Sequence, residues 1–201
     1  MLKVGLTGGL ASGKSFVGAT LAELGCRVLQ ADALGHEVLA PDGEAYSSVV
    51  EAFGEGILGG NGAIDRRRLA AEVFGHPDRL AQLNTLVHPW VLRKEEEWME
   101  RVAAEDARAI AVLEAAILIE TGSYKRFARL ILAVCSEEEQ VRRAMKRDGL
   151  SRDEVLARLN SQMPLSEKQK YADYVIDTSG TKEETRARVA EVYRALREAQ
   201  P

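Results

Sequence analysis

The sequence contains little cysteine, few aromatic residues and no long uninterrupted hydrophobic run. Its two cysteines, Cys26 and Cys135, are too few for a disulfide framework or a four-ligand zinc site, so we interpret both as small buried side chains in a reducing compartment. No apolar stretch approaches the length that crosses a bilayer, and the N-terminal residues lack a signal-peptide pattern. We therefore expect a cytoplasmic protein with no membrane partner.

An excess of basic residues is absent as well. The chain has 27 lysines and arginines against 31 aspartates and glutamates, a formal net charge of -4, which gives no general attraction to nucleic acids. We expect no nucleic-acid partner, and a monomer or a weak homo-oligomer. At 201 residues and 46% hydrophobic content the chain can bury a substantial core.

Short apolar runs alternate with longer amphipathic stretches along the chain. The predicted strands are residues 2–6, 27–30, 109–113, 130–134 and 174–176. The predicted helices cover residues 14–24, 66–74, 78–102, 137–147, 152–159 and 182–198. This alternation predicts the α/β class, with a five-stranded parallel sheet flanked by helices.

One motif in the chain predicts phosphate binding. Residues 8 to 15 read Gly8-x-x-x-x-Gly13-Lys14-Ser15, between a predicted strand and a predicted helix. The glycines let backbone N–H groups turn toward a phosphate, Lys14 would reach the β- and γ-phosphates of ATP, and the Ser15 hydroxyl would bind Mg²⁺. The competing interpretation is a glycine-rich turn that binds nothing.

Asp32 follows the second predicted strand, which we expect to lie close to the phosphate loop. A carboxylate there can orient a hydroxyl, or accept its proton, as that hydroxyl attacks the γ-phosphate. The alternative is that Asp32 caps a helix beginning near Ala33. Both roles are compatible.

Charged residues elsewhere suggest two further parts of a phosphotransfer site. Arg143 and Arg147 lie four residues apart on one predicted helix, where their guanidinium groups would stabilise charge on the transferring phosphate. The alternative is a solvated helix face paired with acidic residues. Glu114 ends the third predicted strand and would hold Mg²⁺ through water, or else form an edge salt bridge.

Several segments together resemble the dephospho-CoA kinase family, and the resemblance covers almost the whole chain. They are residues 5–15, Asp32-Ala33-Leu34 with His36, Asp65-Arg66-Arg67-Arg68-Leu69 with Phe74, His88-Pro89, Glu120, residues 143–150, residues 160–164 and residues 172–177. The chain departs from the family pattern at Ala116 and Ile119, at Leu92 before Arg93, and at Thr178, a position often filled by asparagine.

The resemblance implies ATP-dependent phosphorylation of the ribose 3′-hydroxyl of dephospho-CoA, the last step of coenzyme A synthesis, with Mg²⁺. It implies a P-loop fold like that of nucleoside-monophosphate kinases, with the whole chain, 1–201, forming a single kinase unit. The core of this unit is expected at about 1–31, 106–140 and 171–201. A helical substrate-binding insertion is expected at about 32–105, and a lid at about 141–170. The expected nucleotide-binding residues are Gly8, Gly9, Leu10, Ala11, Ser12, Gly13, Lys14, Ser15 and Phe16. The expected substrate-binding residues are Thr7, Asp32, His36, His88 and Glu120. The alternative for the two histidines is a structural one, with His88-Pro89 at a helix start and His36 simply exposed.

Two other functions are compatible with a phosphate loop. A kinase acting on another nucleotide or small molecule would share the loop, the helical insertion and the arginines. A GTPase-like switch would need a base-specificity motif such as Asn-Lys-x-Asp after a late strand, and residues 134–136 and 176–178 lack it. A small-molecule kinase is therefore the favoured class.

Overall fold

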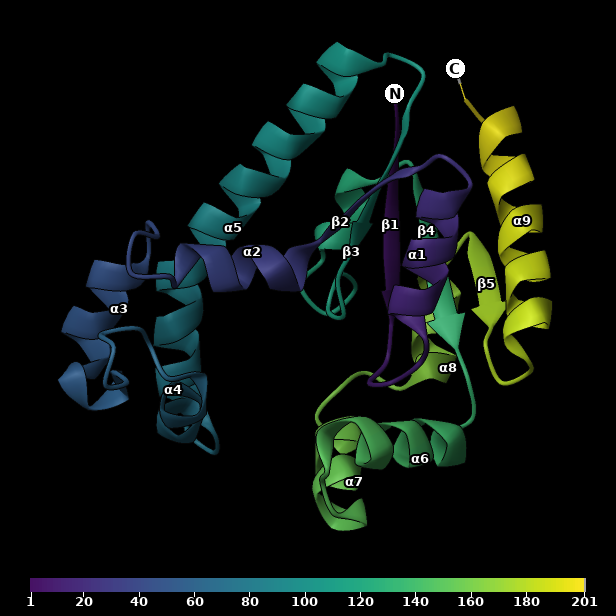
Figure 1. Cartoon of the computed structure of the whole chain (residues 1–201). Helices are drawn as coiled ribbons and strands as arrows, with labels where there is room; N and C mark the ends of the chain where they lie inside the picture. The colour runs from purple at the N-terminus through teal and green to yellow at the C-terminus, as the bar shows by residue number, and fades with distance from the viewer. Residues whose placement is uncertain (201) are drawn as a thin grey trace. The chain divides into compact units, whose positions relative to one another are not determined.

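The five predicted strands form one parallel sheet in the computed structural model, which describes residues 1–200. They are β1 (Leu2–Gly8), β2 (Arg27–Gln30), β3 (Ile110–Glu114), β4 (Arg129–Val134) and β5 (Tyr174–Asp177). Their spatial order is β2-β3-β1-β4-β5, so β1 lies at the centre with β3 and β4 as its neighbours (Figure 1). The predicted fold class is confirmed, but β2 does not lie next to the phosphate-loop strand, because β3 separates them.

The main hydrophobic core lies between the sheet and two helices. α1 (Lys14–Glu23) and α9 (Lys182–Glu198) pack on the same face of the sheet (Figure 1). Both helices contribute fully buried side chains to this core, Leu21 from α1 and Leu196 from α9. Successive side chains of a strand point to opposite faces, which is why Val4 and Leu6 of β1 share this core.

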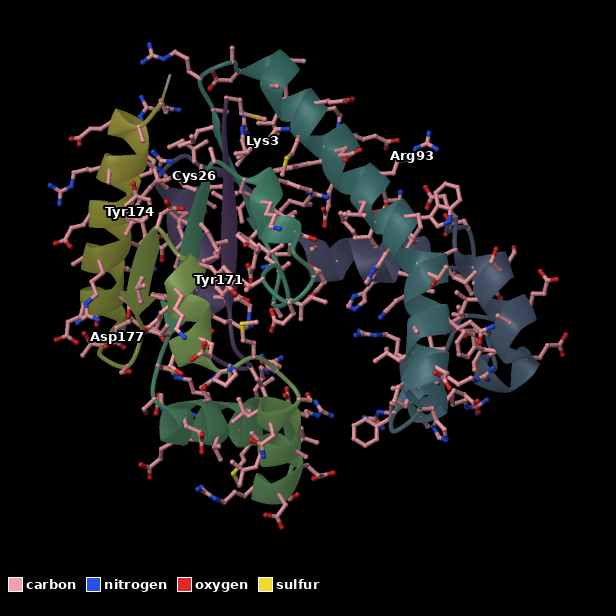
Figure 2. All side chains as sticks on the ribbon, turned by 180° about the vertical axis from the view of Figure 1, so that it is seen from behind. Lys3, Cys26, Arg93, Tyr171, Tyr174 and Asp177 are labelled. Atoms are coloured by element: carbon pink, nitrogen blue, oxygen red, sulfur yellow. The ribbon has the colours of Figure 1, made fainter. Side chains whose placement is uncertain are left out.

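The carboxyl edge of the sheet carries a second group of helices. α6 (Glu137–Asp148) follows β4, and α7 (Arg152–Asn160), α8 (Leu165–Lys168) and the 3₁₀ helix η3 (Gln169–Tyr171) lead into β5. Another 3₁₀ helix, η2 (Ser123–Arg126), lies between β3 and β4. Figure 2 labels Cys26, just before β2, and Asp177, at the end of β5, which mark the amino and carboxyl edges.

Side-chain caps set the starts of the helices in this region. The Ser136 hydroxyl accepts a hydrogen bond from the Glu139 N–H at the start of α6. Ser151 and Glu154 form a reciprocal capping box at the start of α7. These caps satisfy backbone donors that the first turn of a helix leaves unpaired.

The chain divides into two compact units, residues 31–100 and the remainder. The helices of the first are α2 (Ala31–Val38), α3 (Tyr46–Phe53), η1 (Glu55–Ile57), α4 (Arg66–Val73) and most of α5 (Pro77–Glu105), whose last residues belong to the second unit. α3 has no counterpart among the predicted helices. The unit has a core of its own around Val49, Phe53, Ile57 and Leu69.

Pro89 lies inside α5 and not at a helix start. Its ring removes one backbone donor, yet the helix continues on both sides, and the neighbouring Trp90 packs against the core of this unit. The alternative of a helix start at His88-Pro89 was therefore wrong, and the predicted helix over residues 78–102 continues through the proline, because the packing of a long amphipathic helix outweighs the local preference of proline.

We predict that Glu139 stabilises the fold in a pH-dependent way. Hydrogen bonds from Arg142, and then from Arg143, lower the pKa of Glu139 to about 2, and its side chain is only 19% exposed. A carboxylate with a lowered pKa in the folded state contributes stability that is fully present above its ordinary pKa and is lost as the pH falls through the folded value. Glu139→Gln should therefore lower the melting temperature at pH 6, and the difference from the wild type should shrink between about pH 4.5 and pH 2.

Thermal melts of both proteins across this range measure the effect. Glu138→Gln, which changes an exposed neighbour on the same helix, is the matched control. A difference between Glu139→Gln and the wild type that stays constant down to pH 2 would contradict the prediction.

Candidate active site

The predicted phosphate loop is a tight turn between the central strand β1 and helix α1. Among residues 1–200, Ala11 is the one non-glycine residue with a positive φ, 53°, and Gly13 has a φ of 86°. A Cβ on Gly13 would lie 2.8 Å from the Thr178 hydroxyl oxygen, so both the backbone angle and the space require glycine there. The loop thus has the sharply bent backbone that is typical of a phosphate-binding turn.

Lys14 begins α1, and its side chain folds back along the loop. Its Nζ donates to the carbonyl oxygens of Gly8 at 3.3 Å and Gly9 at 3.1 Å. The ammonium is therefore at the loop backbone, where a bound phosphate would meet it. The ring of Phe16, the last of the predicted nucleotide-binding residues, lies near two cations of α9, with Arg186 Cζ at 5.3 Å and Lys182 Nζ at 5.7 Å from its centre. Its role toward a nucleotide stays a prediction.

Ser15 and Glu114 come together at the carboxyl edge, as predicted for a Mg²⁺ site. The Ser15 hydroxyl donates to Glu114 Oε1 at 2.7 Å, and Gln30 Nε2 at the end of β2 donates to Oε2 at 3.3 Å. Glu114 is 6% exposed. In the described part of the chain no group of three or more His, Cys, Asp or Glu residues could hold a metal by itself.

The oxygen donors of Ser15 and Glu114 suit Mg²⁺, which usually takes one or two protein ligands and completes its shell with water and phosphate oxygens. A pair of oxygen ligands is therefore a better fit to this ion than to a metal that needs a complete protein cage. In this structure the Glu114 carboxylate accepts hydrogen bonds from a hydroxyl and from an amide.

The two predicted lid arginines make protein contacts in this structure. Arg143 donates to Glu139 Oε1 at 2.6 Å, and also to the hydroxyl and carbonyl oxygens of Thr178, at 3.0 and 2.6 Å. The Thr178 hydroxyl in turn donates to the carbonyl oxygen of Ser12, so Arg143 is linked to the phosphate loop through one residue. Arg147 is 61% exposed and pairs with Asp148 at 2.7 Å.

Thr7 and Glu120 belong to a side-chain network around the buried Lys168, near the end of β1. The Thr7 hydroxyl donates to the Ala116 carbonyl at 3.2 Å, and Lys168 Nζ donates to the same carbonyl at 3.0 Å. Lys168 is completely buried and forms an ion pair with Glu120 at 2.7 Å. This lysine was not predicted, because a lysine in a polar segment carries no sequence signal of burial.

Asp32, His36 and His88 belong to the unit of residues 31–100, and all three are exposed. α2 begins at Ala31, so Asp32 lies inside its first turn and is not the residue that caps it. Asp32 and His36 are one turn apart on this helix, which places them on one face. His88 lies on α5. Their roles toward a substrate stay predictions.

Both cysteines are buried, as predicted. Burial raises the pKa of the Cys26 thiol to about 12 and also raises the pKa of Cys135. Thiols that stay protonated are poor nucleophiles, so neither is suited to covalent catalysis.

Among residues 1–200 no helix combines the length and apolarity needed to span a bilayer.

Two glutamines at the phosphate loop were not singled out from the sequence. Gln140 Nε2 donates to the Leu10 carbonyl at 2.6 Å, and the Leu10 N–H donates to Gln162 Oε1 at 3.0 Å. Gln162 lies in residues 160–164, one of the segments that resemble the dephospho-CoA kinase family, so the sequence did contain a signal that could have pointed to it. Gln140 lies in a polar run with no recognisable motif.

The fold and sequence are similar to those of known kinases. A family model described as dephospho-CoA kinase matches residues 2–184. A dephospho-CoA kinase from Carboxydothermus hydrogenoformans is 42% identical over 186 residues, which cover 92% of this chain and 90% of that protein. Another from Aquifex aeolicus is 42% identical over 196 residues, 98% of each chain.

The crystal structure of TT1252 from Thermus thermophilus superposes with a TM-score of 0.85 at 38% identity, over 97% of each chain. The extent of these matches excludes a resemblance confined to the phosphate loop, which many unrelated enzymes share. From its sequence, its fold and the geometry of its phosphate loop, this chain belongs to the dephospho-CoA kinase family.

Proposed function

We propose that this protein transfers the γ-phosphoryl group of ATP to the ribose 3′-hydroxyl of dephospho-CoA, giving coenzyme A. The observation that carries the proposal is the family match over residues 2–184, in a chain whose phosphate loop is intact from Gly8 to Ser15. Relatives matched over almost their whole length are named dephospho-CoA kinases, so a kinase for another nucleotide is not favoured. We place the reaction in the cytoplasm, where ATP is available.

The phosphates of ATP would lie on the inward N–H groups of the loop, at the start of α1, where the helix dipole favours negative charge. Lys14 would exchange its two carbonyl contacts for the β- and γ-phosphates. Phosphoryl transfer depends mainly on positioning and charge stabilisation, so this cradle supplies a large part of the catalysis.

Ser15 and Glu114 would hold Mg²⁺, directly or through water. The ion, when bound, would neutralise charge on the phosphate oxygens. The buried carboxylate of Glu114 and the amide of Gln30 keep the Ser15 hydroxyl in place at the loop. These residues fix one side of the nucleotide site.

Asp32 would orient the 3′-hydroxyl and accept its proton, and Arg143 and Arg147 would stabilise charge on the transferring group. Arg147 is exposed and tied to Asp148, while Arg143 is tied to Thr178 next to the loop. Exclusion of water would matter as much as proton transfer, because water competes with the acceptor hydroxyl.

We expect the purified protein, given ATP, Mg²⁺ and dephospho-CoA, to form coenzyme A, detected by mass as the acceptor plus one phosphoryl group. AMP, CMP, UMP and shikimate, tested in parallel, should give little product. Reactions without protein are the control. Equal or faster phosphorylation of any of these other acceptors would overturn the assignment of the substrate.

Asp32→Ala should lower kcat by about 10²-fold or more, because general-base and orienting contributions are of that size. The dissociation constant of ATP should stay near the wild-type value. Asp42→Ala, at another exposed aspartate of the same unit, is the matched control. Wild-type turnover by Asp32→Ala would refute the role given to this carboxylate.

Lys14→Ala should instead weaken ATP binding itself, by about tenfold or more, since the variant loses a cation that contacts two phosphates. Isothermal titration with ATP measures this in the absence of dephospho-CoA. Lys3→Ala removes an exposed lysine from the same strand-loop segment and should bind ATP normally. If both variants bound ATP equally well, Lys14 would not be a phosphate ligand.

A further inference from the structure

One residue of the phosphate loop, Leu10, is held by side chains on both of its backbone groups. Gln140, on the first turn of α6, donates to its carbonyl at 2.6 Å. Gln162, which follows α7, accepts from its N–H at 3.0 Å. Both glutamines come from segments far along the chain, and we call this pair of contacts the glutamine strap.

The strap lies in a closely packed environment. Gln140 is 5% exposed, although glutamine is a residue type that is usually exposed. A Cβ on Gly9 would lie 2.6 Å from Gln140 Nε2, so glycine at this position leaves the room that the amide group occupies. A larger residue there would displace the strap.

Apolar packing reinforces these hydrogen bonds. Leu10 and Ala11 pack against a small core made by Val141 and Ala144 of α6 and Val155 of α7. Figure 1 shows α6 and α7 together at the carboxyl edge of the sheet, where the β1–α1 loop turns. The apex of the phosphate loop is therefore part of the core of the helices predicted to form the lid.

The geometry of the peptide bond gives the strap a consequence for phosphate binding. The Leu10 carbonyl and the Ala11 N–H belong to one planar trans peptide and point in opposite directions. By holding the carbonyl, Gln140 directs the Ala11 N–H to the other side. Gln162 fixes the preceding peptide plane in the same way, through the Leu10 N–H.

Ala11 also needs such support, because it has a φ of 53° without being glycine. A left-handed conformation at a non-glycine residue persists where the surroundings impose it. The strap, acting on the peptide immediately before Ala11, is a restraint of this kind.

We propose that Gln140 and Gln162 are positioning residues for the nucleotide. They preset the direction of the N–H groups at the apex of the loop, and they couple the affinity for ATP to the helices α6 and α7. This inference rests on the proposed function only in taking ATP as the ligand.

Titration of ATP into Gln140→Met and Gln162→Met, without dephospho-CoA, tests the proposal. Each variant loses one hydrogen bond to the loop, so we expect ATP to bind about 5- to 10-fold more weakly. In steady-state assays KM for ATP should rise while KM for dephospho-CoA stays unchanged. Each melting temperature must exceed the assay temperature, and Gln162, which is only partly buried, provides a second variant if Gln140→Met unfolds.

Two controls separate hydrogen bonding from general destabilisation. Gln169→Met makes the same substitution at an exposed glutamine and should bind ATP like the wild type. Val155→Ala loosens the small core of α6 and α7 without removing a strap contact. Wild-type ATP affinity in both strap variants, or losses no larger than that of Val155→Ala, would overturn the proposal.

Glutamate substitutions test which atom matters at each position. Gln162→Glu keeps an acceptor oxygen for the Leu10 N–H, whereas Gln140→Glu removes the donor to the Leu10 carbonyl. Both substitutions add the same charge, so Gln162→Glu should weaken ATP binding less than Gln140→Glu does. Equal losses of ATP affinity in the two variants would contradict the strap. Because ATP binding is measured without an acceptor, failure to form coenzyme A would count against the proposed function and leave this test intact.

Discussion

The backbone turn from Gly9 to Gly13 is the constraint on which the rest of this site depends. A turn of this kind bends the backbone sharply, and it contains two residues with positive φ, Ala11 and Gly13. Such a turn does not persist alone. Here its outer side is held by side chains from three later parts of the chain: Gln140 and Gln162 at Leu10, and Thr178 at Ser12. The sheet and the helices α6 and α7 thus stabilise the loop by satisfying the groups that face away from the ligand.

The central position of β1 makes this possible. With β3 on one side and β4 on the other, the loop after β1 is within reach of the segments that follow both neighbours. Glu114 at the end of β3 contacts Ser15 and Gln30, and Gln140 follows β4. Ligands of open parallel sheets bind at the carboxyl ends of the strands for this reason, since several loops converge there.

The ion pair between the buried Lys168 and the more exposed Glu120 organises a second part of this edge. It connects α8, which leads into β5, with the segment after β3, and Lys168 also holds the Ala116 carbonyl that Thr7 contacts. A charge removed from water is costly unless it is paired and hydrogen-bonded, and Lys168 has both kinds of partner. The side chains of Thr7 and Glu120, which we predict to bind substrate, therefore already have fixed hydrogen-bond and ion-pair partners in the protein.

The sequence alone determined the five strands, most of the helices, the phosphate loop and the family, because these depend on local periodicity and on residues in one continuous motif. It also assigned Ser15 and Glu114 to the same ion, Mg²⁺. The tertiary structure decided the strand order, which places β3 between β1 and β2, and the inclusion of Lys168, Gln140 and Gln162 around the site. These features rest on contacts between residues tens to more than a hundred positions apart, and the energy of a long-range contact leaves no periodic pattern in the sequence that makes it.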